Sequence, residues 1–258
     1  MSYTFSVVLL VVVLFGGMLS LLTIGQRLGR QNLPQETDAA RARLTAVEAA
    51  IFGLLGLLIA FTFFGASGRY ELRRQLVVDE ANAIGTAYLR LDLLPASAQP
   101  ALREKFRRYL EARIAVYRVL PDLDASMRQA AVAASLQKEI WAGAIAALRE
   151  APSQVTIVLI PALNEMFDVT TSRATAALTH TPAMIVGLLV ALALVCSLLA
   201  GYVMAASKPR NVILHSFAFA LVLTVTVYVI FDLDYPRFGL IQLDFADQPL
   251  FDLLAGMK

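Results

Sequence analysis

The polar side chains best placed to act together lie between residues 73 and 90. Five of them recur at steps of four, three, four and four residues, which places them on one stripe of an α-helix: Gln75, Asp79, Asn82, Thr86 and Arg90. Such a stripe of carboxylate, amide, hydroxyl and guanidinium groups holds water. It is equally typical of a solvated helix face or of a hydrogen-bonding seam between helices, so these alternatives stay open.

The same stripe becomes apolar toward the N-terminus. About 18 residues make five full helical turns, so Leu57 lies above Gln75, Phe61 above Asp79 and Phe64 above Asn82. Phenylalanines in a membrane helix usually face lipid or a packed core. A continuous helix over both stretches would nevertheless carry one face that is aromatic at one end and polar at the other.

Three further charged residues crowd the same segment, namely Arg73, Arg74 and Glu80. We expect them to form packing contacts or pairs between subunits. The chain has no Ser-His-Asp order, glycine-rich phosphate loop or zinc protease motif, and neither His180 nor His215 has a second ligand at metal-binding spacing. The sequence therefore predicts no metal site and no cofactor, and a protein that is not an enzyme.

The chain contains four long runs without a charged side chain, which indicate that parts of it lie in a lipid bilayer rather than in water. They are residues 1–26, 49–68, 181–207 and 211–231. About 20 apolar residues at a rise of 1.5 Å cross a hydrocarbon core of about 30 Å. Hydrophobic residues make up 58% of the chain and charged residues 16%, and the net charge of +2 gives no argument for a nucleic acid partner. We expect an integral membrane protein in contact with the lipid bilayer.

The pattern predicts two membrane hairpins around one polar insert. Residues 1–68 form the first hairpin, with helices at about 5–24 and 48–68 joined by a link that contains Gly25 and Gly29. Residues 69–180 form a helical extramembrane domain, into which the second helix continues as far as Pro95. Residues 181–231 form the second hairpin, with helices at about 182–206 and 212–231, and residues 232–258 are a C-terminal tail. Period-two alternation is absent, so the fold class is an all-α polytopic membrane protein.

Local signals add detail to this outline. Apolar residues at three- and four-residue steps predict an amphipathic helix over residues 101–120, and Asp124 is a candidate N-cap for the next helix. Four glycines have the spacing of close helix packing, Gly53, Gly56, Gly65 and Gly68. The tail is acidic but does not match an EF-hand, so we expect it to be solvated rather than to bind calcium.

The most specific sequence motif in the chain is RRQLVVDEANAIGTAYLRLDLLP, at residues 73–95, and it is preceded by the apolar segment Phe52–Phe63. This text resembles the hallmark of the bacterial bestrophin-like membrane domain family, and the resemblance extends from about Val47 to Leu253. The segment Asp232–Gly239, DLDYPRFG, is similar to the acidic-Pro-Phe-Gly segment that follows the last membrane helix of bestrophin channels.

The resemblance implies a bestrophin-like ring, a homopentamer whose central pore is lined by the second membrane helix and passes small inorganic ions. The neck would then be formed by Leu57, Phe61 and Phe64, and the vestibule by Gln75, Asp79, Asn82, Thr86 and Arg90. The sign of the ion stays open, because Arg73, Arg74 and Arg90 favour anions whereas Asp79 favours cations. The alternative function is a non-conducting membrane scaffold or sensor whose helical insert binds a partner protein.

Membrane orientation is poorly determined by charge. The short links carry six positive residues and the membrane-proximal stretches on the opposite side carry five. The positive-inside rule therefore hardly distinguishes which of the two sides faces the cytosol. The resemblance implies a bacterial inner (plasma) membrane location, with the helical domain and both termini in the cytosol.

Overall fold

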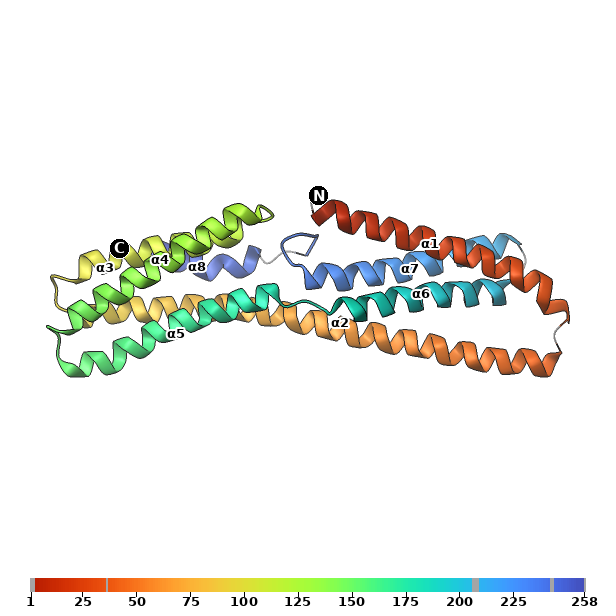
Figure 1. Cartoon of the computed structure of the whole chain (residues 1–258), viewed down its shortest axis with the longest axis horizontal. Helices are drawn as coiled ribbons and strands as arrows, with labels where there is room; N and C mark the ends of the chain where they lie inside the picture. Colours follow the sequence, from red (N-terminus) through yellow and green to blue (C-terminus); the bar gives the residue numbers. More distant parts are fainter. Residues whose placement is uncertain (1–2, 36, 206–208, 242–243, 258) are drawn as a thin grey trace. The chain divides into compact units, whose positions relative to one another are not determined.

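The computed structural model describes residues 3–35, 37–205, 209–241 and 244–257. These residues form helices and connecting turns without a strand, which confirms the predicted all-α fold. The main chain divides into two compact units (Figure 1). The membrane unit comprises residues 1–68 and 180–235, and the helical domain comprises residues 69–179 and 236–258.

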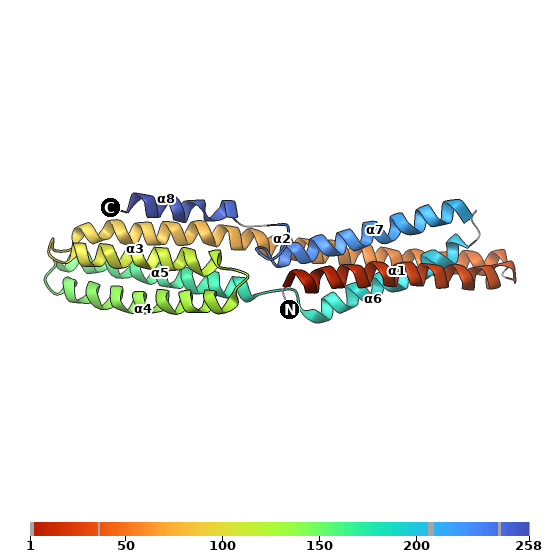
Figure 2. The same ribbon diagram turned by 90° about the horizontal axis from the view of Figure 1, so that it is seen from above.

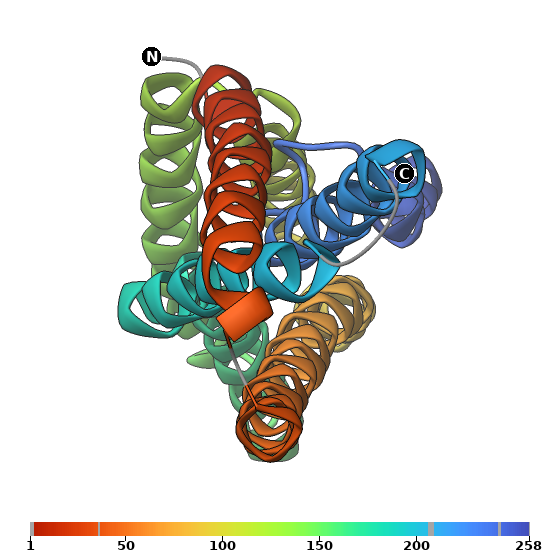
Figure 3. The ribbon, with the colours of Figure 1, turned by 90° about the vertical axis from the view of Figure 1, so that its right-hand side faces the viewer.

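The membrane unit contains α1 (Tyr3–Asn32), the N-terminal part of α2 (Asp38–Leu89), α6 (Ala183–Met204) and α7 (Pro209–Asp234). α1 packs against α6 and α7 (Figure 3). The unit's core contains fully buried apolar side chains from these helices, among them Met18, Leu22, Leu189, Cys196 and Ala220. These core side chains are apolar, so they pack against one another through van der Waals contact.

Four helical stretches in the described part of the chain are long and apolar enough to cross a membrane: Leu9–Asn32, Arg41–Leu93, Ser153–Met204 and Val212–Asp234. Each overlaps one of the four predicted membrane segments. The protein is therefore a membrane protein with four candidate spanning helices.

The helix α2 is much longer than a bilayer requires. It has 52 residues, which at 1.5 Å per residue gives a length of about 78 Å against a hydrocarbon core of about 30 Å. It begins at Asp38, within the predicted link, and is followed by a 3₁₀ turn, η2 (Arg90–Leu93), just before Pro95. A single helix thus carries both the apolar and the polar parts of the predicted stripe except Arg90, which is the first residue of η2.

Two glycines of the predicted link are helical instead. α1 continues to Asn32, and a Cβ atom at Gly25 would lie 2.0 Å from the carbonyl oxygen of Leu198 in α6. A Cβ at Gly29 would lie 2.4 Å from the carbonyl oxygen of Tyr202, and on α6 itself Gly201 faces Leu22 in the same way at 2.1 Å. These glycines allow the backbones of α1 and α6 to approach closely.

The glycines predicted for close packing on α2 behave differently. Gly53, Gly56 and Gly68 have no neighbouring heavy atom within 4 Å of the position of a Cβ. The prediction of close packing within the chain is therefore wrong for these three residues. Their spacing resembles that of a packing motif, but they lie where the protomer leaves α2 uncovered.

The helical domain packs the C-terminal part of α2 with α3 (Gln99–Arg118), α4 (Leu123–Leu148), α5 (Ser153–Leu178) and α8 (Gln248–Gly256) (Figure 2). The core includes the fully buried side chains of Ile84, Phe106, Tyr109, Ile140 and Met166. A 3₁₀ turn, η3 (Asp244–Asp247), precedes α8. The N-cap of α4 is Asp122, whose Oδ1 accepts a hydrogen bond from the amide of Ala125 at 2.9 Å, so the prediction of Asp124 as the cap is wrong.

Substitution of Gly25 with Ala should destabilise the membrane unit, because the added methyl group would meet the α6 backbone rather than a flexible side chain. Overpacking of this kind costs about 1–3 kcal/mol. We expect a lower melting temperature of the detergent-solubilised protein.

The matched control is Gly16→Ala on the same helix, where a Cβ meets nothing within 4 Å. There the better helix propensity of Ala should leave stability unchanged or raise it by up to about 1 kcal/mol. Equal melting temperatures for both variants would contradict the close approach of α1 and α6.

Candidate functional site

The membrane part of α2 has one packed face and one uncovered face. Leu55, Thr62 and Ala66 are buried against the membrane unit, with exposed fractions of 3%, 6% and 0%. The three predicted neck residues lie on the opposite face: Leu57 is 51% exposed, Phe61 66% and Phe64 72%. Because the helix turns about 100° per residue, these two sets fall on opposite sides of one cylinder.

The polar part of the stripe is also left uncovered by the rest of the chain. Gln75, Asn82 and Thr86 are exposed, and Asp79 and Arg90 are partly exposed. The amide of Gln75 donates a hydrogen bond to the Asp79 carboxylate at 2.9 Å. The other four predicted vestibule residues line one open cavity of about 400 Å³, whose other side is lined by α5.

The two predicted packing arginines differ in their surroundings. Arg73 is buried and donates to the carbonyl oxygens of Ala176 at 3.0 Å and Thr179 at 2.7 Å, at the C-terminus of α5. A cation at this end of a helix interacts favourably with the helix dipole. Arg74 is exposed and pairs with Glu71 at 2.8 Å, one helical turn away.

The buried carboxylate of Glu80 is the centre of an ionic network that the sequence did not predict. Its side chain is fully buried and accepts hydrogen bonds from Arg113 at 2.5 Å and from Arg173. The hydroxyl of Thr170 donates to the same carboxylate at 3.4 Å and lies 2.7 Å from the hydroxyl of Tyr109. Burial alone would raise the pKa of Glu80, but the two guanidinium groups outweigh it and hold the pKa below its ordinary value.

The network extends to the C-terminal segment through a second carboxylate. Asp247 accepts from Arg173 at 3.1 Å and from Arg237 at 2.8 Å. The ring of Tyr117 stacks with three guanidinium groups, those of Arg173, Arg237 and Arg113, at 3.9, 5.2 and 5.5 Å from its centroid. Arg237 adopts a left-handed backbone conformation with φ of 92°, which a non-glycine residue rarely takes without support.

Three aspartates of the acidic tail are not freely solvated, whereas Asp252 is exposed as predicted and the burial of Asp244 lies outside what the structure describes. Asp232 and Asp234 are buried in the membrane unit, and Asp247 is largely buried in ion pairs of the helical domain. The amide of Thr181 donates to the Asp234 carboxylate at 2.7 Å. His180 lies 3.0 Å from the Asp234 carbonyl oxygen and stacks on Tyr235 at 4.1 Å, so its ring is a packing element.

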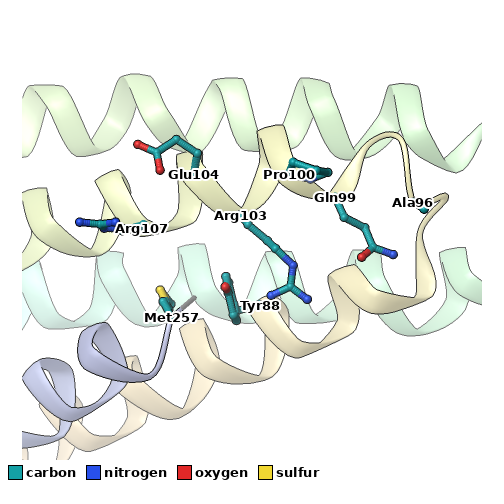
Figure 4. A pocket seen from close by; sticks show the side chains of 8 residues that line it. All are labelled: Tyr88, Ala96, Gln99, Pro100, Arg103, Glu104, Arg107 and Met257. Carbon is teal, nitrogen blue, oxygen red and sulfur yellow. The ribbon is translucent and has the colours of Figure 1, made fainter.

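A further pocket of about 350 Å³ lies between Tyr88 of α2, Ala96, α3 and Met257 (Figure 4). Arg103 packs over the ring of Tyr88 and pairs with Asp92, and Arg107 pairs with Glu111 at 3.3 Å. Both guanidinium groups of this pocket are thus used within the chain, so we assign the pocket no ligand.

The fold and the stripe together define an all-α polytopic membrane protein in which one long helix carries an uncovered aromatic and polar face. A family model described as a bestrophin-like domain matches residues 12–244. The chain belongs to the bestrophin-like family.

Solved structures of low sequence identity share the fold. A crystal structure of a bacterial bestrophin homologue from Klebsiella pneumoniae, obtained by zinc phasing, has 13% identity and a TM-score of 0.60 over 92% of this chain and 97% of that one. A tryptophan-to-alanine variant of such a homologue from the same organism has 13% identity and a TM-score of 0.63 over 93% and 97%. No match was found among curated proteins.

Replacement of Glu80 with Gln should strongly destabilise the helical domain. It would leave the buried guanidinium groups of Arg113 and Arg173 without a counter-charge, a change that typically costs about 3–5 kcal/mol. The measurement is thermal unfolding in detergent followed by circular dichroism. Glu71→Gln, which removes an exposed carboxylate paired on the same helix, is the matched control and should change stability by less than about 1 kcal/mol.

The pH dependence gives a second readout of the same group. The folded-state pKa of Glu80 is lowered, so its stabilising contribution is present above the unfolded-state pKa of about 4.3 and is lost as the pH falls through the folded-state pKa. The Gln variant should therefore lose less stability than the wild type on acidification below about pH 4. Parallel losses in both proteins would show that Glu80 does not carry this contribution.

Proposed function

We propose that this chain is the protomer of a homo-oligomeric ion channel, a pentameric ring that passes small inorganic ions through a pore lined by α2. The observation that carries the proposal is the position of the stripe. The face of α2 that the protomer leaves uncovered bears the residues that suit a neck and a vestibule, whereas the opposite face is packed into the protomer.

A ring makes use of this asymmetry. If several protomers surround an axis with α2 innermost, the uncovered faces share one water-filled path and the packed faces stay within each protomer. Leu57, Phe61 and Phe64 would then form a hydrophobic constriction that gates by excluding water. Asp79, Asn82 and the neighbouring polar groups would keep the vestibule below it hydrated.

The membrane in which the channel lies and its orientation there are inferred from family membership alone. We place it in the bacterial inner membrane with the helical domain and both termini in the cytosol. Membership of the bestrophin-like family supports this orientation, since the distribution of Lys and Arg does not decide it.

Assembly is the first test of the channel. Native mass spectrometry and particle symmetry in detergent should show a closed ring, with five protomers and with α2 nearest the rotation axis. A monomer, or a dimer in which the stripe of α2 faces lipid or a packed core, would remove the shared water path. That outcome would favour the alternative, a non-conducting scaffold or sensor that binds a partner protein through its helical domain.

The neck is the second test. Replacing Phe61 or Phe64 with Ala should widen and wet the constriction and raise the basal conductance in planar bilayers. Both rings are mostly exposed in the protomer, so their truncation should cost much less than the about 3–5 kcal/mol of a buried phenylalanine. Size-exclusion profiles would establish that the variants remain assembled.

The matched control is Phe63→Ala. Phe63 lies about 100° or more around the helix from each neck phenylalanine. Its ring centroid nevertheless lies 6.3 Å from the ring centroid of Phe64. This variant should conduct like the wild type. If Phe63→Ala raised the conductance while the assembled double variant of Phe61 and Phe64 did not, a different face of α2 would line the pore.

A further inference from the structure

The cavity beside the stripe contains a carboxylate from a second helix. Its lining comprises residues of α2, including Asp79, Asn82 and Thr86, with Arg90 of η2, and residues of α5, namely Pro161, Ala162, Glu165 and Val169. Glu165 is exposed in the protomer. Periodicity along α2 could not place this residue, because it belongs to another part of the sequence.

The contacts between the two helices fix the level of Glu165. α2 and α5 run antiparallel (Figure 1). Arg73 of α2 is bonded to Ala176, Glu80 of α2 to Thr170, and Arg90 of the following turn η2 to Val158. Glu165 therefore lies between the levels of Thr170 and Val158, beside Ala83 of the same cavity. This is about one helical turn, or about 6 Å, from Asp79 in the direction away from the apolar part of α2.

The charges around the cavity do not balance. Arg73 is buried on α5 carbonyl groups, Arg74 is paired with Glu71, and Arg90 donates to the Val158 carbonyl oxygen. The cavity itself is lined by two carboxylates, those of Asp79 and Glu165, and by one guanidinium group. Repeated around an axis, this excess would give two successive negative levels between the neck and Arg90.

We infer that Glu165 is a selectivity-determining residue of the vestibule, which together with Asp79 makes the path prefer small cations over anions. The inference rests on the proposed channel and names the sign of its ion. Carboxylates that surround a path raise the local concentration of cations and lower that of anions without a dedicated binding site.

The experiment is a charge series at position 165 in purified protein reconstituted into planar bilayers, with the permeability ratio of potassium to chloride taken from the reversal potential in a KCl gradient. The wild type should prefer potassium. Glu165→Gln should lower the ratio by about threefold, and Glu165→Lys should lower it further. Glu165→Asp should retain most of the preference, and Asp79→Asn should lower the ratio as Glu165→Gln does.

The matched control is Glu150→Gln, which removes an exposed carboxylate beyond the end of α4 and should leave the ratio unchanged. A conducting wild type whose ratio stays constant through the series at position 165, while Asp79→Asn changes it, would overturn the role of Glu165 and leave the channel intact. A wild type that prefers chloride would also overturn it. An assembled wild type that passes no ions would instead overturn the proposed function, and the role of Glu165 with it.

Discussion

The pairing of the buried Glu80 carboxylate with Arg113 and Arg173 is the constraint on which the orientation of α2 depends. A carboxylate cannot be buried without compensation, so this side of the helix must face the two arginines. Asp79, one residue earlier, is rotated by about 100° and comes to the edge of the uncovered face. Arg73, two turns before Glu80, anchors the same packed face to the end of α5. The stripe faces outward because its neighbours are held inward.

The stripe itself could be predicted from the sequence because it depends only on helical periodicity. The Glu80 network could not, since its arginines lie 33 and 93 residues away along the chain and only the packing of three helices brings them together. Glu165 was missed for the same reason. One signal was available: it is the only charged residue between Ser153 and Phe167, and a lone carboxylate in an apolar helix needs water or a partner.

The glycines show why spacing is a weaker guide than environment. Gly25 and Gly29 read as parts of a link, yet they permit backbone contact between α1 and α6. Gly53, Gly56 and Gly68 have the spacing of a packing motif, yet they have open space beside them in the protomer. A one-dimensional pattern cannot distinguish these cases, because what a glycine allows depends on the backbone that approaches it. Gly53, Gly56 and Gly68 lie on α2, and it is the opposite face of α2 that packs into the core of the membrane unit.

The ionic network contributes more to orientation than to stability. Well-packed apolar side chains of similar volume often replace a buried ion pair at no cost, whereas the loss of one partner is expensive. An apolar seam would tolerate small rotations of α2 about its axis, but Glu80 cannot leave its two arginines without exposing three buried charges to an apolar core. Because Arg173 also holds Asp247, which in turn pairs with Arg237, the same constraint secures the C-terminal segment to the domain. One fixed helix face thus determines which residues the protomer offers to its surroundings.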